Sequence, residues 1–192
     1  MMRLTQSHVL CIGLYQATTK HLMNHFRIKA HQGLSMRIKS RYPEVVEYSA
    51  ETVWDGETGG IVLVGGGKEV SFDTPQSYGG RGQGICPDEL FVSAVLGCLN
   101  NTFLDFQRRY ELVLVSLRLQ GRATSRFDGQ GYRITGIRVS GQVTVGQGDL
   151  DAGRRCVDLM KEYCHLSRSL KECIPVEYDI KVTEGEALGR NG

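Results

Sequence analysis

Short runs of apolar, β-branched and aromatic residues, bounded by turn signals, occur in the first half of the chain and predict β-strands. Residues 45–54 have strand character, and residues 61–64 and 69–72 form two further short runs. Glycine-rich turn signals, Gly59-Gly60 and Gly65-Gly66-Gly67, lie between these runs. The pattern predicts an antiparallel meander of three strands.

The hydrophobic pattern changes after residue 72. Residues 73–86 are rich in glycine and predict an irregular loop, of the kind that often lies at a site or an interface. A helix is predicted from Pro87 to about Arg109, because proline suits the first helical turn and two acidic residues follow it. The first half of this helix is apolar on nearly all sides, which predicts that most of it is buried.

The second half of the chain predicts a hairpin, two helices and a last strand. Its elements are strands over 112–127 and 132–145, a helix over 149–163, a shorter helix that begins after Cys164 and ends near Cys173, and a strand over 175–183. The resulting order, βββ-α-ββ-αα-β, predicts an α+β fold in which antiparallel sheets pack around central helices. We expect a single domain over residues 36–192.

Residues 1–42 differ from the rest of the chain in charge. They hold seven Lys and Arg and no acidic residue, whereas the other 150 residues hold 16 basic and 21 acidic groups. We therefore expect residues 1–35 to be a basic extension outside the domain. The net charge of +2 argues against a nucleic-acid partner, and no apolar run approaches the roughly 18 residues that would span a membrane. Six cysteines without a CxxC pair favour a reducing compartment, so we predict a cytoplasmic protein.

Two of the cysteines lie where thiol chemistry is plausible. Cys98 is in the middle of the apolar helix, and Cys164 directly precedes a helix, whose first N–H groups favour a thiolate. Either residue alone could simply be packing filler. A mid-helix thiol gains little from its own helix dipole, so Cys98 needs a cation, and Arg81 in the glycine-rich loop is the candidate. Asp88, or Glu89 beside it, could hold that guanidinium in place.

Two segments resemble the motifs of the OsmC/Ohr family. They are GGRGQGICPDELFVSAVLGC, which ends at Cys98, and CHLSRSL, which begins at Cys164. The resemblance covers about residues 45–184 and implies an intertwined homodimer with two sites at its interface. It further implies reduction of organic hydroperoxides, with Cys98 as the attacking thiol and Cys164 as the resolving thiol. A dithiol reductant would restore both thiols, and no cofactor or metal is implied. The apolar helical neighbours of Cys98 suit an alkyl chain.

Two alternatives to a peroxidase stay open on the sequence. Cys156, Cys164 and His165 lie on adjacent helical turns and could contribute to a zinc site, although no paired spacing supports one. A protein that kept the fold without efficient turnover, acting as a binding or structural protein, is the other alternative. Bound metal would identify the first, and a peroxide-consumption assay would identify the second.

Overall fold

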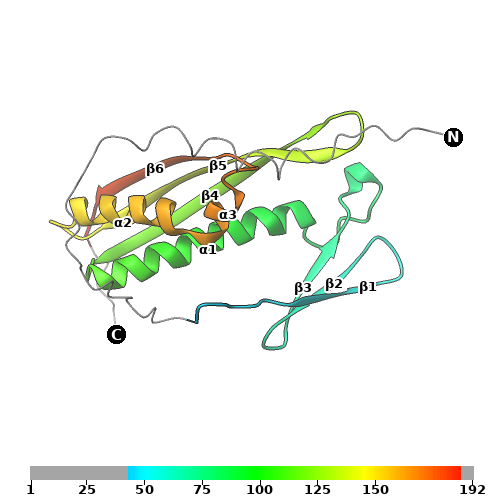
Figure 1. Cartoon of the computed structure of the whole chain (residues 1–192), viewed down its shortest axis with the longest axis horizontal. Coiled ribbons are helices and arrows are strands. Elements are labelled where there is room, and N and C mark those ends of the chain that lie inside the picture. The colour runs from blue at the N-terminus through cyan, green and yellow to red at the C-terminus, as the bar shows by residue number, and fades with distance from the viewer. Residues whose placement is uncertain (1–42, 187–192) are drawn as a thin grey trace, which may run out of the picture. The chain divides into compact units, whose positions relative to one another are not determined.

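The computed structural model describes residues 43–186, and those from Glu47 onward belong to one compact unit (Figure 1). The expected N-terminal extension lies outside the described residues. The elements are β1 (Ala50–Trp54), β2 (Gly59–Val64), β3 (Lys68–Asp73), a 3-10 turn η1 (Gln76–Tyr78), α1 (Pro87–Arg109), β4 (Leu114–Phe127), β5 (Tyr132–Val145), α2 (Leu150–Tyr163), α3 (His165–Leu170) and β6 (Val176–Glu184). The predicted element order is confirmed. No helix in the described part of the chain has both the length and the apolar character needed to cross a membrane.

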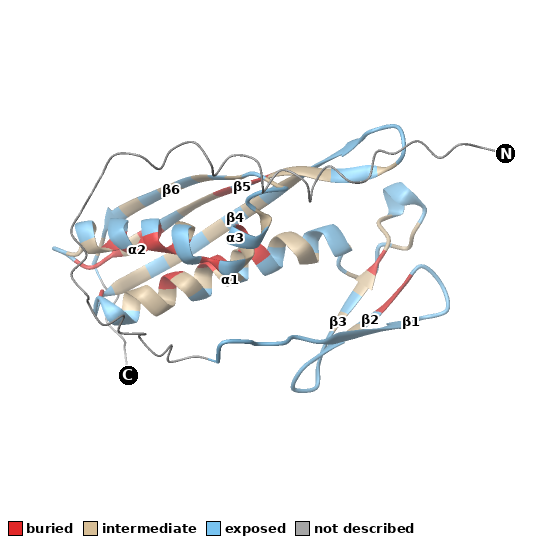
Figure 2. Ribbon diagram, viewed as in Figure 1, coloured by how far each residue is buried: buried red, intermediate tan, exposed pale blue. Residues whose placement is uncertain are grey.

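Strands β1, β2 and β3 form an antiparallel sheet in that order. The predicted first strand is too long, because Ala50 already pairs with Val64 at the end of β2 and residues 45–49 have no strand to pair with. Most side chains of this sheet are exposed, as the pale blue strands in Figure 2 show. The sheet therefore buries little apolar surface of its own.

Strands β4, β5 and β6 form the second sheet. β4 and β5 are an antiparallel hairpin whose turn is fixed by Asp128, which accepts the N–H groups of Gln130 and Gly131 at 3.1 and 3.2 Å. β6 runs parallel to β5, so the prediction of purely antiparallel sheets is wrong for this strand. The two helices between β5 and β6 carry the chain back along the sheet, and such a crossover makes the two strands parallel.

The core lies between the second sheet and the three helices. Val139, Val143 and Val145 of β5 are fully buried against Leu99 and Phe103 of α1, and α2 adds Cys156 and Met160. The helix and strand approach closely at Gly121 of β4, where an added Cβ would lie 2.7 Å from Val92 of α1. The absence of a side chain there lets α1 pack directly on the strand.

Helix α1 is less buried in one chain than its sequence predicts. Only Val95, Leu99 and Phe103 are buried, whereas Ser93, Ala94 and Gly97 are exposed. The second sheet and α2 cover one side of the helix, and nothing in the described part of the chain covers the other.

Candidate active site

The structure brings the two predicted cysteines together, although they are 66 residues apart. Cys98 is half-buried in the middle of α1, and Cys164 is fully buried between α2 and α3. Their sulfur atoms are 3.2 Å apart, and both cysteines are free thiols. This pair is the first feature of the candidate site.

Cys164 owes its position to the junction of two helices. Its N–H donates to the carbonyl of Met160 at 3.0 Å, which completes α2, and its own carbonyl accepts the N–H of Arg168 at 3.0 Å, which starts α3. Its backbone, with φ −59° and ψ 114°, departs from helical values and turns the chain between the two helices. The side chain is thereby fixed toward α1, where it meets Cys98.

The surroundings of Cys98 act on its thiol in opposite directions. Burial raises the pKa of Cys98 most strongly, and the neighbouring Cys164 thiol raises it further. The backbone N–H groups of Leu166 and His165, at the start of α3, lower it. The sequence predicted that this first turn would act on Cys164, but its N–H groups are directed at Cys98 instead. The net result is a pKa of Cys98 above the ordinary value. The described part of one chain therefore favours the neutral thiol of Cys98 over the thiolate.

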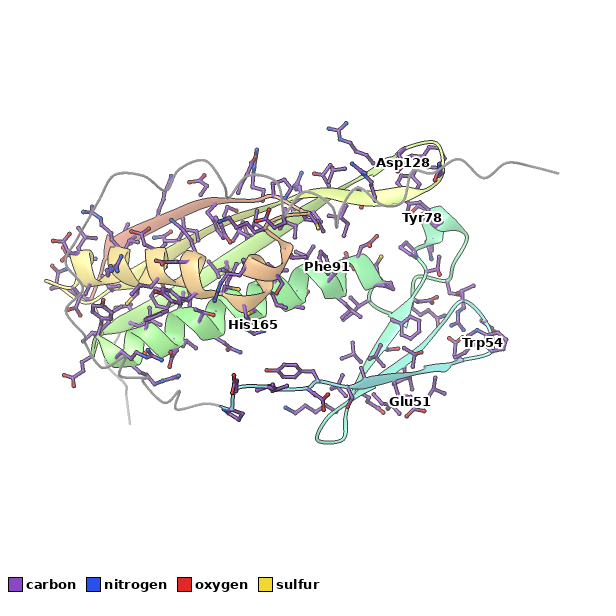
Figure 3. All side chains as sticks on the ribbon, viewed as in Figure 1. Glu51, Trp54, Tyr78, Phe91, Asp128 and His165 are labelled. Atoms are coloured by element: carbon purple, nitrogen blue, oxygen red, sulfur yellow. The ribbon has the colours of Figure 1, made fainter. Side chains whose placement is uncertain are left out.

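His165 is the site residue for which the sequence predicted no role in thiol chemistry. It is the exposed first residue of α3, and its side chain reaches α1 (Figure 3). Its ring nitrogens Nδ1 and Nε2 lie 3.4 and 3.8 Å from the Cys98 sulfur. The sequence did carry a signal for this contact. His165 directly follows Cys164, so a pairing of Cys164 with Cys98 also brings His165 near Cys98.

Arg81 is bound by acidic residues of β3 and of the turn between β1 and β2, and not by Asp88. Its guanidinium makes ion pairs with Asp55, with Glu57 at 2.5 Å, and with Asp73 at 3.5 Å. These contacts raise the pKa of Arg81, and the hydrogen bond to Asp55 contributes most. No contact of Arg81 with either thiol is found among residues 43–186.

The two acids predicted to orient Arg81 lie at the start of α1. Asp88 is exposed there and lines a groove with Val92, Leu96 and Gly121. Glu89 accepts the N–H of Cys86 at 3.3 Å and so closes the N-terminus of its own helix. Within one chain, neither acid contacts the guanidinium or the thiols in the part that the structure describes.

The zinc alternative finds no support in the geometry. Cys156 is buried in the core, and in the described residues no group of three or more His, Cys, Asp and Glu side chains is arranged to hold a metal ion. The arrangement that the structure does offer is two thiols in contact with each other and an imidazole beside one of them. Such an arrangement suits reversible thiol oxidation.

The fold and the thiol pair together define an α+β protein with a dithiol site. The model of the OsmC-like protein family matches residues 80–179, a span that contains both cysteines. The chain belongs to the OsmC-like family. No curated protein matches the sequence.

Solved structures share this fold at low sequence identity. An OsmC-like protein from Mycoplasma pneumoniae is 10% identical with a TM-score of 0.63, and the match covers 72% of this chain and 98% of that one. An organic hydroperoxide resistance protein OsmC from Legionella pneumophila is 15% identical with a TM-score of 0.59, covering 72% and 99%. A putative organic hydroperoxide resistance protein from Vibrio cholerae, with captopril in one active site, is 21% identical with a TM-score of 0.53, covering 77% and 99%.

Proposed function

We propose that this protein is a thiol-dependent peroxidase that reduces organic hydroperoxides, with Cys98 as the attacking thiol and Cys164 as the resolving thiol. The observation that carries the proposal is the 3.2 Å contact between the two sulfurs. A sulfenic acid formed on one of them arises within reach of the other, which is the condition for rapid disulfide formation. The names of the Legionella and Vibrio structures point to the same substrate class.

The reaction proceeds in two steps. The Cys98 thiolate attacks one peroxide oxygen, the O–O bond breaks, and the alkoxide leaves and takes up a proton to become the alcohol. The Cys164 thiol then attacks the sulfur of the Cys98 sulfenic acid, the S–S bond forms, and the hydroxyl leaves as water with the proton of the thiol. Two thiols are oxidised to one disulfide as the peroxide is reduced, and an external dithiol restores both thiols by exchange.

The difference in solvent exposure between Cys98 and Cys164 indicates which thiol reacts with the peroxide. Cys98 is half-buried, whereas Cys164 is fully buried behind it. Partly buried apolar side chains, among them Phe91 and Leu166, pack on the core together with Cys98. An apolar surround binds an alkyl group better than it binds hydrogen peroxide, so we infer that alkyl and aryl hydroperoxides are the preferred substrates.

The partner that we infer is a second copy of the chain. Val53, Trp54 and Ile61 expose 48%, 71% and 38% of their surface on the first sheet, and one face of α1 is uncovered as well. Exposed apolar surface on two separate elements is typical of an obligate interface, which buries roughly 2,000 Å² or more. Sedimentation at micromolar concentration should find a dimer, and a stable folded monomer would contradict this inference.

Arg81 and Asp88 stay predicted residues of the site. Because they contact neither sulfur within one chain, they would have to act on the thiols of the second copy. The intertwined dimer that the family implies offers such an arrangement. A mixed dimer of Cys98→Ser and Arg81→Ala chains tests it: cross-chain action predicts one fully competent site in each mixed dimer.

Mass spectrometry after one equivalent of cumene hydroperoxide tests the function. Peptide mapping should find a Cys98–Cys164 disulfide, and steady-state turnover with a dithiol should consume the peroxide. Cys98→Ser should abolish the reaction, and Cys164→Ser should leave a sulfenic acid that dimedone traps. Cys173→Ser is the matched control, since this thiol is exposed and outside the pair. A Cys98 that stays reduced would favour the binding protein without turnover.

A further inference from the structure

His165 is in direct contact with the sulfur that the proposed reaction uses. Its Nδ1 lies 3.4 Å from the Cys98 sulfur, and the Cys164 sulfur lies 3.2 Å from the same atom. Because His165 immediately follows Cys164 in the chain, the turn that delivers the resolving thiol also delivers the imidazole. The Cys98 sulfur therefore has one thiol and one titratable base as its side-chain partners.

The contact matters because Cys98 lacks another cation within the described chain. Burial raises the pKa of Cys98, and the N–H groups of α3 only partly offset that effect. The positive charge of Arg81 is already surrounded by the carboxylates of Asp55, Glu57 and Asp73. A histidine beside a cysteine can take its proton and remain as an imidazolium next to the thiolate, which is a common way to activate a thiol.

Two charged groups on the helices that pack against α3, Asp105 and Lys161, form ion pairs with residues of their own helices. α1 and α2 are the helices that pack on α3. On α1, Asp105 follows Cys98 by two turns and pairs with Arg109 at 2.6 Å and with Arg108 at 3.6 Å. On α2, Lys161 pairs with Asp158 at 3.4 Å. The imidazole of His165 contacts Cys98, and within the described residues it forms no ion pair with a carboxylate.

We propose that His165 is a catalytic residue, the proton partner of Cys98, and this role rests on the peroxidase function proposed above. The imidazole accepts the proton of the Cys98 thiol and leaves a thiolate. The thiolate attacks the hydroperoxide, the O–O bond breaks, and the imidazolium returns its proton to the departing alkoxide to give the alcohol. The histidine ends the step neutral, Cys98 ends it as a sulfenic acid, and the resolving step proceeds through Cys164.

The first test measures Cys98 alone and needs no peroxide. Iodoacetamide labelling of Cys98 is followed by peptide mass spectrometry from pH 5 to pH 10 in the wild type, in His165→Gln and in Arg168→Gln. Arg168→Gln is the matched control, because it removes a positive charge from the same short helix at an exposed position.

We expect the labelling rate at neutral pH to fall about 3- to 30-fold in His165→Gln. This range corresponds to the loss of a cation worth roughly 1–3 pKa units, half offset by the greater nucleophilicity of a less acidic thiol. The wild-type profile should keep a shoulder at lower pH that His165→Gln lacks, and Arg168→Gln should retain it. Identical profiles for wild type and His165→Gln would overturn the proposal.

The second test addresses the proton donor. In single turnover with cumene hydroperoxide, His165→Gln should lose more rate than its labelling predicts, because the alkoxide leaves without a proton. Equal losses would overturn the donor half of the role. If peroxide is not consumed by the wild type but the labelling shift is present, the peroxidase function fails while the Cys98–His165 pair stands.

A third measurement does not depend on the folding of His165→Gln. Among the five histidines, one ring-proton resonance should change its chemical shift in Cys98→Ser, since the imidazole of His165 contacts the sulfur that this substitution removes. If no histidine resonance shifts, the proposed pair does not exist.

Discussion

The two sheets of this protein are stabilised by different means. The β4–β6 sheet is covered by helices and carries fully buried side chains such as Val139 and Val143. The β1–β3 sheet exposes most of its side chains, and its buried groups are two glycines and Asp73. Polar contacts take the place of a core there: Asp73 accepts hydrogen bonds from Thr58 at 2.7 Å and from the Gln83 N–H at 3.0 Å. The thiol site belongs to the first kind of region, and Arg81 belongs to the second.

The largest difference between the regions should appear when the same substitution is made in both. Val139→Ala removes two methyl groups from a fully buried position in β5 and should destabilise the fold by about 2–3 kcal/mol. Val53→Ala, at a position 48% exposed in β1, should change the free energy of unfolding by at most about 0.5 kcal/mol through contacts within its own chain, so a larger loss would measure the burial of Val53 in the proposed dimer. Urea unfolding followed by circular dichroism measures both. Equal losses would mean that the first sheet has a core of its own, or that a partner supplies one.

Glycine substitutions should give a smaller contrast of the same kind. Gly121→Ala places a Cβ 2.7 Å from Val92 and should cost about 1–2 kcal/mol, because α1 must move away from β4. Gly65→Ala, in the turn between β2 and β3, meets no atom within 4 Å and should be neutral or stabilising by up to about 1 kcal/mol. A destabilised Gly65→Ala would show that this turn packs against another surface.

The hydrogen-bonded carboxylates of Asp55 and Asp73 should make the first sheet the more acid-sensitive region. The N–H of Glu57 holds the pKa of Asp55 below its ordinary value, and the Thr58 hydroxyl does the same for Asp73. A carboxyl whose folded pKa is depressed stabilises the fold above its unfolded pKa of about 4, and this stabilisation is lost as the pH falls through the folded pKa.

The chain carries its own probe for this loss. Trp54, the single tryptophan, donates its indole N–H to the Glu57 carbonyl at 2.9 Å within the first sheet. On acidification below about pH 4, tryptophan fluorescence should change before the helical signal at 222 nm is lost. In Asp73→Asn the fluorescence transition and the 222 nm transition should lie closer together in pH, because the side chain at position 73 can no longer titrate. Coincident transitions in the wild type would mean that the two regions unfold as one.

The smallest effect should follow from Arg81→Ala on the labelling rate of Cys98. Since three carboxylates already surround the guanidinium, its removal should slow labelling less than His165→Gln does. A larger loss in Arg81→Ala would identify the guanidinium, acting across the dimer, as the main activator. The first sheet, whose residues hold Arg81, would then form part of the active site.

Local sequence patterns predicted the elements well but did not predict their partners. Pro87 and the acidic residues after it predicted the start of α1, and Asp128 with its glycine neighbours predicted the hairpin, because these signals act within a few residues. The parallel pairing of β6 was missed, since strand direction depends on where two intervening helices return the chain. The pairing of Cys98 with Cys164 came from motif resemblance. The contact of His165 with Cys98 follows from that pairing together with its place beside Cys164, whereas the binding of Arg81 by Asp55 and Asp73 depends on tertiary placement that no spacing encodes.

The contact between sulfurs 66 residues apart in the chain also has a thermal consequence. Joining Cys98 to Cys164 would close a loop of that length and remove many conformations from the unfolded ensemble, worth about 4 kcal/mol by the loop-entropy relation. The oxidised protein should therefore melt at a higher temperature than the reduced protein. A melting curve then reports how much of the population has met peroxide and not yet been reduced, so the redox history of a sample can be read from its stability alone.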